Sequence, residues 1–325
     1  MDHLGNAVAH CCAECGEEEG GVSLKTCKSC MLVRYCNANC QRNHWSTHKQ
    51  ACKRRSAELR NEALFKDPPP KEDCPICFLP MPYSLICCIS LPPATILSVP
   101  IHDYAIANNE ELNDKVMERY YTCCGKQVCE GCIHSFVQSG NDEKCPFCNA
   151  ERKRNATDEE NVGGILKRAE ANDASAMNVL GSWYYHGIHD LHQDHAKAMA
   201  LFTKSAELGC SKAHNNLASI YHHRGDLKKA KFHVEAAAMA EDEAARCNLG
   251  ILECNSGNME RSIKHWTIAA SAGEYNAMHQ LRKFFKKGVV SRESIDATLA
   301  AYNNSCAEMR SEARDAIIRV MTRTV

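Results

Sequence analysis

Residues 12–52 read CAECGEEEGGVSLKTCKSCMLVRYCNANCQRNHWSTHKQAC, and this segment decides how the chain folds. It holds seven cysteines and two histidines, and the cysteines together with the second histidine are grouped in pairs with two or three residues between the members. The pairs are Cys12 and Cys15, Cys27 and Cys30, Cys36 and Cys40, and His48 and Cys52. Zinc takes thiolate and imidazole ligands in a closed tetrahedron, and one tight Cys-x-x-Cys loop supplies two of them. Eight ligands at these spacings predict two zinc sites.

The residues between the ligands make this segment similar to the MYND family of zinc fingers. Tyr35 precedes Cys36, and residues 40–52 read CQRNHWSTHKQAC, the family's Cys-Gln-x-x-x-Trp-x-x-His-x-x-x-Cys tail. The resemblance implies a groove for a proline-containing peptide, lined by Gln41 and Trp45. It also implies interleaved ligand sets, in which one zinc ion is bound by Cys12, Cys15, Cys36 and Cys40 and the other by Cys27, Cys30, His48 and Cys52.

Metal binding is expected to supply the folding free energy of this segment. A segment this short cannot bury enough apolar surface to offset its chain entropy. The alternative, a cluster of free or disulfide-bonded cysteines, fits poorly with eight ligands at family spacing. Closed four-ligand sites leave no position open for a reacting group, so the segment is predicted to bind partners and not to catalyse.

A second set of cysteines follows the triple proline at residues 68–70. It contains Cys74 and Cys77, then CCGKQVCEGC at residues 123–132, then the closing pair in CPFC at residues 145–148. This order resembles a RING finger, which opens with Cys-x-x-Cys and ends with Cys-Pro-x-Cys. The family's histidine is replaced here by Lys126, whose ammonium group offers zinc no lone pair.

The resemblance to a RING finger implies a cross-brace of two zinc ions. One ion would be bound by Cys74, Cys77, Cys129 and Cys132, and the other by Cys123, Cys124, Cys145 and Cys148. Adjacent cysteines reach one ion only where the backbone turns sharply. The long internal loop, residues 78–122, also contains Cys87 and Cys88, which are alternative ligands for the second ion.

RING fingers act as ubiquitin ligases, and they position a ubiquitin-conjugating enzyme without supplying a nucleophile. By resemblance, the docking surface would include Ile76 and Pro146, and no residue of this chain is predicted to be catalytic. The family's activating arginine follows the last cysteine directly, where this chain has Asn149. The alternative is a RING-like platform that binds zinc without ligase activity.

From about residue 161 onward the chain is rich in alanine and repeats with a period of 32 residues. Columns at this spacing are Leu217, Leu249 and Leu281; Ala213, Ala245 and Ala277; Ala198, Ala230 and Ser262; and Ala206, Ala238 and Ala270. Repeats of this length are helix-turn-helix units that bury their apolar faces only by stacking, which predicts a solenoid. Residues 176–184 and 197–209 resemble the two helices of a Sel-one-like repeat, a relative of the tetratricopeptide family. Ser291 is predicted to begin a last helical region that caps the array.

Charge and cysteine usage limit the partners and the compartment. A net charge of -1 and an isoelectric point near 6.9 argue against a nucleic-acid-binding surface. Residues 79–101 lack charge, but they contain five prolines, so we expect a buried loop and no membrane contact. The first ten residues do not resemble a signal peptide, which predicts that the cysteines serve metal binding in the cytoplasm or nucleus.

The sequence therefore predicts a multidomain protein in which two small zinc-stapled fingers precede an all-α helical-repeat solenoid. The expected boundaries are an N-terminal tail at 1–10, a MYND-type finger at 11–52, a helical and proline-rich linker at 53–73, a RING-type finger at 74–150, a linker at 151–160 and the repeats at 161–325. We expect a zinc-binding scaffold for protein and peptide partners that acts as a RING-type ubiquitin ligase on a ubiquitin-conjugating enzyme. The alternative is a non-catalytic adaptor in which the fingers and repeats only bind proteins.

Overall fold

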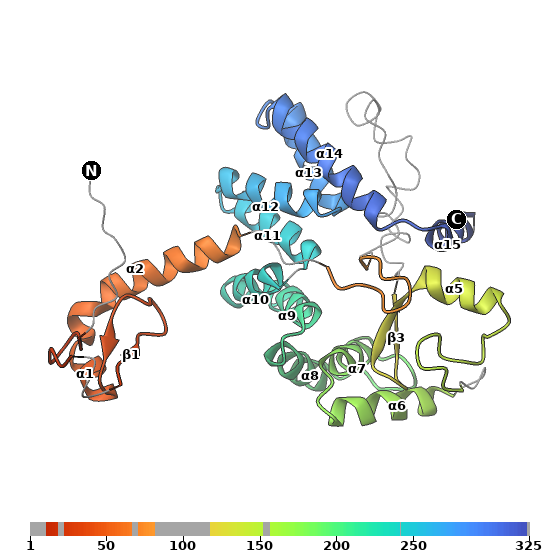
Figure 1. Ribbon diagram of the computed structural model, residues 1–325, viewed down its shortest axis with the longest axis horizontal. Helices are drawn as coiled ribbons and strands as arrows, with labels where there is room; N and C mark the ends of the chain where they lie inside the picture. The colour runs from red at the N-terminus through yellow and green to blue at the C-terminus, as the bar shows by residue number, and fades with distance from the viewer. Residues whose placement is uncertain are drawn as a thin grey trace. The chain divides into compact units, whose positions relative to one another are not determined.

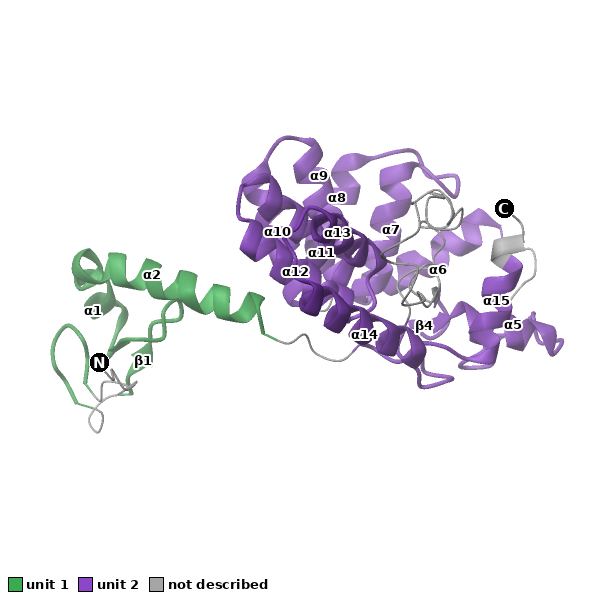
Figure 2. Ribbon diagram, turned by 90° about the horizontal axis from the view of Figure 1, so that it is seen from above, with its two compact units in different colours: residues 1–66 green, residues 67–325 purple. Residues whose placement is uncertain are grey.

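The computed structural model describes residues 11–18, 23–66, 71–81, 118–151, 157–240 and 242–323. The chain forms two compact units, residues 1–66 and residues 67–325, which Figure 2 shows in different colours. The predicted N-terminal tail, the triple proline and the alternative ligands Cys87 and Cys88 lie outside the described residues. So does most of the uncharged stretch at 79–101.

The first unit contains a short hairpin followed by two helices, and we call residues 12–52 the first finger. Its elements are β1 (Lys25–Thr26), β2 (Arg34–Tyr35), α1 (Ala38–Asn43) and α2 (Trp45–Leu64). The side chain of Asn37 accepts hydrogen bonds from the amides of Asn39 and Cys40, so α1 begins directly after Asn37. Helix α2 continues without a break from the ligand-bearing turn through the helical part of the predicted linker.

The core of the first finger is too small to fold on burial alone. Its buried cluster consists of four cysteines, Leu24 and Tyr35. Burying two such side chains contributes about 1.5–3 kcal/mol each. Ordering the backbone costs about 1–2 kcal/mol per residue. A structural zinc site contributes about 10–16 kcal/mol, so metal binding has to supply most of the difference.

The second unit contains another short hairpin followed by a helix, and we call residues 74–148 the second finger. Strands β3 (Glu118–Tyr121) and β4 (Lys126–Cys129) pair antiparallel, and α5 (Glu130–Gln138) follows β4 directly. Tyr121, Val128 and Ile133 form its buried cluster together with three cysteines. The finger therefore also depends on sulfur-rich contacts around a few apolar side chains.

The rest of the second unit consists of helices, and all but the last of them pack on their neighbours along the chain (Figure 1). The helices are α6 (Asp158–Glu170), α7 (Ala174–His186), α8 (His195–Glu207), α9 (Ser211–His223), α10 (Leu227–Met239), α11 (Glu243–Asn255), α12 (Met259–Ser271), α13 (Tyr275–Lys286), α14 (Arg292–Glu308) and α15 (Glu312–Arg323). Helices α6 to α14 form the repeat array. Helix α6 begins inside the stretch predicted as a linker, because Thr157 and Glu160 form a capping box.

The repeat register predicted from the 32-residue spacing is confirmed by burial. The alanines of the first column, Ala213, Ala245 and Ala277, are fully buried. The leucines at 217, 249 and 281 are at most 1% exposed. Small side chains at these positions let neighbouring helices approach closely, and the leucines fill the space between them.

The second finger contacts both the start of the repeat array and α15, the helix that follows the array. Near the start of the array, the Tyr120 hydroxyl donates to the Asp173 carboxylate at 2.6 Å, and Arg168 donates to the Thr122 carbonyl at 2.8 Å. Beyond the array, α15 packs against α5. The second finger is thus held by helices that lie more than 100 residues apart in the sequence.

The C-terminal region differs in part from the prediction that it caps the array. The N-cap at Ser291 is confirmed, since its hydroxyl accepts from the Ser294 amide at 3.1 Å. Helix α14 covers the end of the array, where Tyr302 and Cys306 join the core of the last helices. Helix α15 instead leaves the array and packs on the second finger.

Glycine is required at position 250, where the first helix of a repeat faces an aromatic ring. A Cβ on Gly250 would lie 2.5 Å from the indole nitrogen of Trp266, which is 1% exposed. We expect Gly250→Ala to destabilise the fold by about 1–3 kcal/mol. That cost exceeds the roughly 1 kcal/mol that alanine gains in a helix. Urea unfolding followed by circular dichroism measures the change.

Gly163 provides the matched control for this prediction. It lies inside α6, and a Cβ there would meet no atom within 4 Å. Gly163→Ala should leave stability unchanged or raise it by up to about 1 kcal/mol. If Gly250→Ala proved as stable as Gly163→Ala, the close contact between helix backbone and indole ring would be wrong.

Candidate metal centres

The structure brings the sixteen predicted ligand residues together in four groups of four. Within each group the ligand atoms all lie within 4.8 Å of one another. The groups have the same members as the sets implied by the family resemblances: Cys12, Cys15, Cys36 and Cys40; Cys27, Cys30, His48 and Cys52; Cys74, Cys77, Cys129 and Cys132; and Cys123, Cys124, Cys145 and Cys148.

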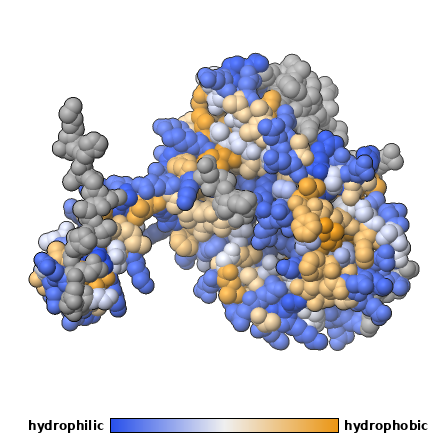
Figure 3. All heavy atoms as spheres, in the orientation of Figure 1, coloured by the Kyte–Doolittle hydropathy of each residue, from blue (hydrophilic) through white to orange (hydrophobic). Residues whose placement is uncertain are grey.

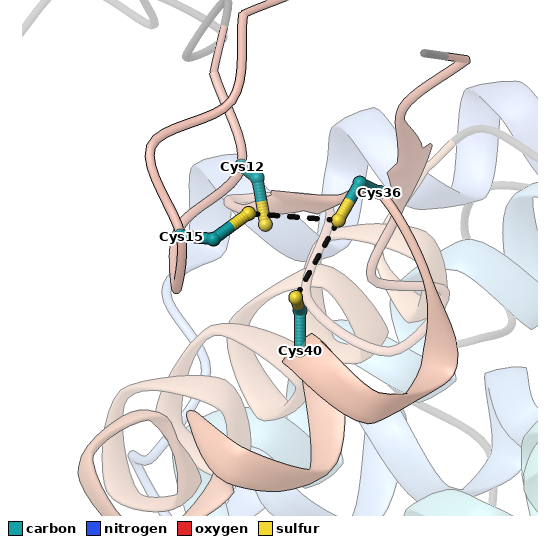
Figure 4. A group of neighbouring side chains, drawn as sticks. All are labelled: Cys12, Cys15, Cys36 and Cys40. Atoms are coloured by element: carbon teal, nitrogen blue, oxygen red, sulfur yellow. Dashed lines mark hydrogen bonds between the residues drawn. The ribbon is translucent and has the colours of Figure 1, made fainter.

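Figure 4 shows the first of these groups, in which four sulfurs point toward one centre. Cys12 and Cys15 come from the loop before β1, Cys36 follows β2, and Cys40 lies in α1. The Cys36 sulfur lies 3.6 Å from that of Cys15 and 3.4 Å from that of Cys40. Three separate parts of the first finger therefore meet at one point.

The distances between the sulfurs fit zinc and exclude disulfides. Zinc–sulfur bonds of 2.3 Å in a tetrahedron place the sulfurs about 3.8 Å apart, whereas a disulfide requires about 2.05 Å. In the second finger, Cys74 and Cys132 are 3.9 Å apart, and Cys123 and Cys148 are 3.5 Å apart. All cysteines among the described residues are free.

The backbone of the Cys-x-x-Cys loops has the same turn in both fingers. The residue after the second cysteine has a positive φ in four loops: Gly16, Met31, Phe78 and Asn149. Its amide donates to the carbonyl of the first cysteine, at 2.9 to 3.0 Å in every case. A left-handed conformation is costly for residues as bulky as methionine and phenylalanine. A metal ion held by both sulfurs of the turn would offset that cost.

The second group is the one that contains a histidine. The His48 Nε2 atom lies 3.3 Å from the Cys30 sulfur, and His48 is 5% exposed. His48 and Cys52 are one turn apart on α2, so the helix presents both side chains on one face. His44 stacks on His48, and its Nδ1 is hydrogen-bonded to the Tyr35 hydroxyl at 2.9 Å.

Local electrostatics favour the thiolate at two cysteines of the first finger, whereas a hydrogen bond with Cys40 raises the pKa of Cys36 to about 12 and burial raises that of Cys52 to about 12. Burial raises the pKa of Cys27. Hydrogen bonds from the Cys30 amide and the His48 side chain lower it by more than burial raises it, and the resulting pKa is about 6. Cys12 behaves in the same way, because three backbone hydrogen bonds outweigh burial and bring its pKa to about 6. The thiolate is the form that binds zinc. Burial and the neighbouring thiolates raise the pKa of Tyr35 to about 12, so its hydroxyl keeps its proton.

The adjacent cysteines of the second finger sit in a sharp turn between β3 and β4. Gly125 has a φ of +69° there, and its amide donates to the Tyr121 carbonyl at 2.8 Å. The turn aims both neighbouring sulfurs at the closing loop, with Cys124 lying 3.9 Å from Cys145. The Lys126 ammonium lies outside the group, 5.9 Å from the centre of the Phe147 ring.

The four residues predicted to contact partners all have exposed atoms. Gln41 and Trp45 are exposed, and Trp45 keeps 42% of its surface accessible. Ile76 and Pro146 are half-buried, and each has an exposed phenylalanine close by in its own loop, at 78 and 147. Figure 3 shows hydrophobic residues gathered on the second unit, over the region where Figure 1 draws β3 and α5.

A groove of about 310 Å³ lies between α9, α10 and α11 of the repeat array. Its polar lining includes the amides of Asn215, Asn248 and Asn255, and its apolar lining includes Val234 and Ile251. The sequence patterns do not predict this groove, because its lining comes from three helices. The available signal is the presence of asparagines in the first helices of two successive repeats.

Comparison with known families identifies two of these parts. Residues 12–52 match the family model of the MYND finger, and residues 174–210 and 211–242 each match that of the Sel1 repeat. The chain contains a MYND finger and Sel1 repeats. The MYND finger is a zinc-binding domain, so zinc is the cofactor of this chain. Both kinds of module bind proteins, which makes the chain a protein-interaction scaffold.

The chain is similar to parts of longer proteins. It is 27% identical over 171 residues to the ERAD-associated E3 ubiquitin-protein ligase component HRD3B of Arabidopsis thaliana, covering 49% of this chain and 27% of that protein. It is 46% identical over 46 residues to a SET and MYND domain-containing protein of Dictyostelium discoideum, covering 13% of this chain and 8% of that protein. The chain therefore spans well under half the length of either relative.

Among solved structures, a Sel1 repeat protein from Oxalobacter formigenes matches 56% of this chain and 72% of its own, at 19% identity and a TM-score of 0.41. None of the described helices has the length and apolar character needed to span a membrane.

The four groups predict how much zinc the chain binds. We expect four zinc ions per chain, measured by plasma mass spectrometry on purified protein. Cys27→Ala should reduce the content to three, because a site with three ligands left binds zinc far more weakly. Cys254→Ala, at a cysteine of the repeat array outside the groups, should leave four. A content of two in the unchanged chain would contradict zinc binding by the second finger.

Proposed function

We propose that this scaffold is a ubiquitin ligase whose second finger docks a ubiquitin-conjugating enzyme and whose MYND finger and Sel1 repeats recruit substrates. The proposal includes the assignment of the sixteen grouped residues as zinc ligands. The observation that carries it is the pair of four-sulfur groups in the second finger, which hold the loops of Ile76 and Pro146 on one small domain.

The second finger offers apolar side chains that a partner protein would cover. Phe78 is 75% exposed and Phe147 is 44% exposed, and both lie in zinc-binding loops. Val137, on α5, is 43% exposed. Aromatic side chains that are exposed on a rigid support are typical anchors of protein interfaces. A conjugating enzyme would be positioned by such contacts and would supply the reactive thioester itself.

The similarity to HRD3B supports the ubiquitin-ligase proposal by analogy. That protein is described as a component of a ubiquitin ligase. The matched segment covers about a quarter of its length, so the analogy extends to a role within a ligase assembly and not to a particular substrate.

The second candidate function is a non-catalytic adaptor, and two residues favour it. Lys126 occupies the position of the histidine in RING fingers, and Asn149 occupies the position of the activating arginine. In this function the second finger is a structural part of the scaffold. Its exposed phenylalanines then bind a partner other than a conjugating enzyme.

The MYND finger binds a proline-containing peptide through Gln41 and Trp45 in our proposal. The Trp45 indole is 42% exposed and stands beside His48, with ring centres 6.3 Å apart. An indole surface suits the flat face of a proline ring, and a glutamine amide can bind the peptide backbone. The proposed zinc ligand His48, whose ring contacts the indole, helps to fix the position of Trp45.

The Sel1 repeats hold a further segment of a partner in the groove between α9 and α11. Asparagine amides can both donate to and accept from an extended peptide backbone, while Val234 and Ile251 contact its side chains. We place the protein in the cytoplasm or nucleus, because thiols stay reduced and available to zinc there.

Ubiquitin discharge from loaded conjugating enzymes tests the ligase proposal directly. In single-turnover assays with a panel of these enzymes, the full chain should accelerate discharge. Ile76→Ala should reduce the acceleration by about tenfold, the usual loss at an interface anchor. Ile188→Ala makes the same change at an exposed position of the array and should have no effect. If no conjugating enzyme showed accelerated discharge although the chain held its full zinc content, the ligase proposal would be wrong and the adaptor function would stand.

Peptide selection tests the MYND surface separately. A displayed library of proline-containing peptides should yield ligands for the full chain. Trp45→Ala should weaken their binding by about tenfold or more, because an aromatic anchor is lost. Lys49→Ala, on an exposed position of the same helix, should have little effect. Unchanged binding by Trp45→Ala would rule out the proposed groove.

A further inference from the structure

Arg314 on α15 is a buried arginine that reaches into the second finger. It is fully buried, although it lies on the last helix that the structure describes. Its guanidinium donates five hydrogen bonds to residues from three other parts of the chain. The acceptors are the Cys129 sulfur at 3.4 Å, the Cys77 sulfur at 3.4 Å, the Pro80 carbonyl at 2.7 Å, the Leu79 carbonyl at 3.2 Å and the Met309 carbonyl at 2.6 Å.

These bonds use the full donor capacity of the side chain. A guanidinium has five N–H groups in a rigid planar fork, and each of the five acceptors takes one of them. A lysine ammonium has three donors on one atom and cannot reach two sulfurs and three carbonyls together. The site is therefore built for arginine.

The two sulfur acceptors supply the charge that a buried guanidinium needs. Removing a positive charge from water is costly unless a negative charge lies beside it. Cys77 and Cys129 belong to one four-sulfur group. Four thiolates around a divalent zinc ion carry a net charge of about minus two. The buried arginine and such a centre neutralise each other in part.

The backbone of α5 also approaches Arg314 closely, at a position where only glycine leaves enough space. A Cβ on Gly131 would lie 2.6 Å from the Arg314 Cγ and 2.8 Å from the Arg314 amide nitrogen. Gly131 lies in the first turn of α5, between the ligands Cys129 and Cys132. The helix that carries Cys132, and that begins directly after Cys129, thus packs on the backbone of α15.

We infer that α15 is part of the zinc centre formed by Cys74, Cys77, Cys129 and Cys132, and that Arg314 is its positioning residue. This inference rests on the proposed ligand assignment. Arg314 orients two thiolates and shields them from electrophiles, and the metal in turn holds the C-terminal helix on the finger. Outer partners of metal ligands typically change metal affinity by roughly 10–100-fold when they are replaced.

The test measures zinc release from the full chain into a chromogenic chelator. Arg314→Lys keeps the charge and most of the volume, so it should fold and should still bind four zinc ions. One of the four ions should leave at least about tenfold faster than in the unchanged chain, and the other three at the same rate. Iodoacetamide labelling read by mass spectrometry should then modify Cys77 and Cys129 first. Arg310→Gln, which removes an exposed ion pair with Asp315 at the start of α15, is the matched control and should change neither readout.

The outcomes separate this inference from the proposal beneath it. If Arg314→Lys releases all four ions at the rates of the unchanged chain, packing alone explains the buried arginine and the inference is overturned. Faster release of all four ions also overturns it, because the effect is then on the whole fold. If the unchanged chain binds two ions, the ligand assignment itself fails before Arg314 is tested.

Discussion

The bond between zinc and thiolate is the constraint on which both fingers depend. The first finger buries Leu24 and Tyr35 beside its cysteines, and the second buries three apolar side chains beside its own. Neither set can offset the entropy of ordering the surrounding loops. The left-handed residues after the Cys-x-x-Cys pairs show the same dependence, since Met31 and Phe78 adopt a costly conformation that brings two sulfurs together. The fingers are rigid supports because metal holds them.

The repeat array is stabilised by helix packing and not by zinc–thiolate bonds. The second finger contacts the first helices of the array and α15. Stacked helices bury columns of alanine and leucine, so the array is stabilised by the packing of neighbouring repeats. Tyr120 ties the second finger to the first helices, and Arg314 ties it to the last. Loss of metal from this finger should therefore weaken its contacts with the first helices of the array and with α15. The groove between α9 and α11 lies in the same unit as the second finger.

Sequence reasoning succeeds here where the signal is local. A 32-residue period specifies which face of each helix is buried, and the columns at 213 and 217 follow directly from it. Ligand spacing within a short loop likewise indicates which sulfurs can meet. The contact of Arg314 with Cys77 joins residues 237 positions apart, and the sequence around neither residue contains a pattern that predicts it. For the same reason the pattern of residues 291–324 predicts helices without showing that α15 leaves the array, and the groove between three helices has no sequence signature of its own.

X-ray absorption at the zinc edge tests the central claim that four closed, sulfur-rich zinc centres hold this chain together. The four groups contain fifteen cysteines and one histidine. The average zinc ion should therefore show a dominant shell of sulfur at about 2.3 Å, with nitrogen a minor component near one ligand in sixteen. A large shell of nitrogen or oxygen at about 2.0–2.1 Å would mean that imidazole, carboxylate or water replaces many of these thiolates, and it would contradict the account.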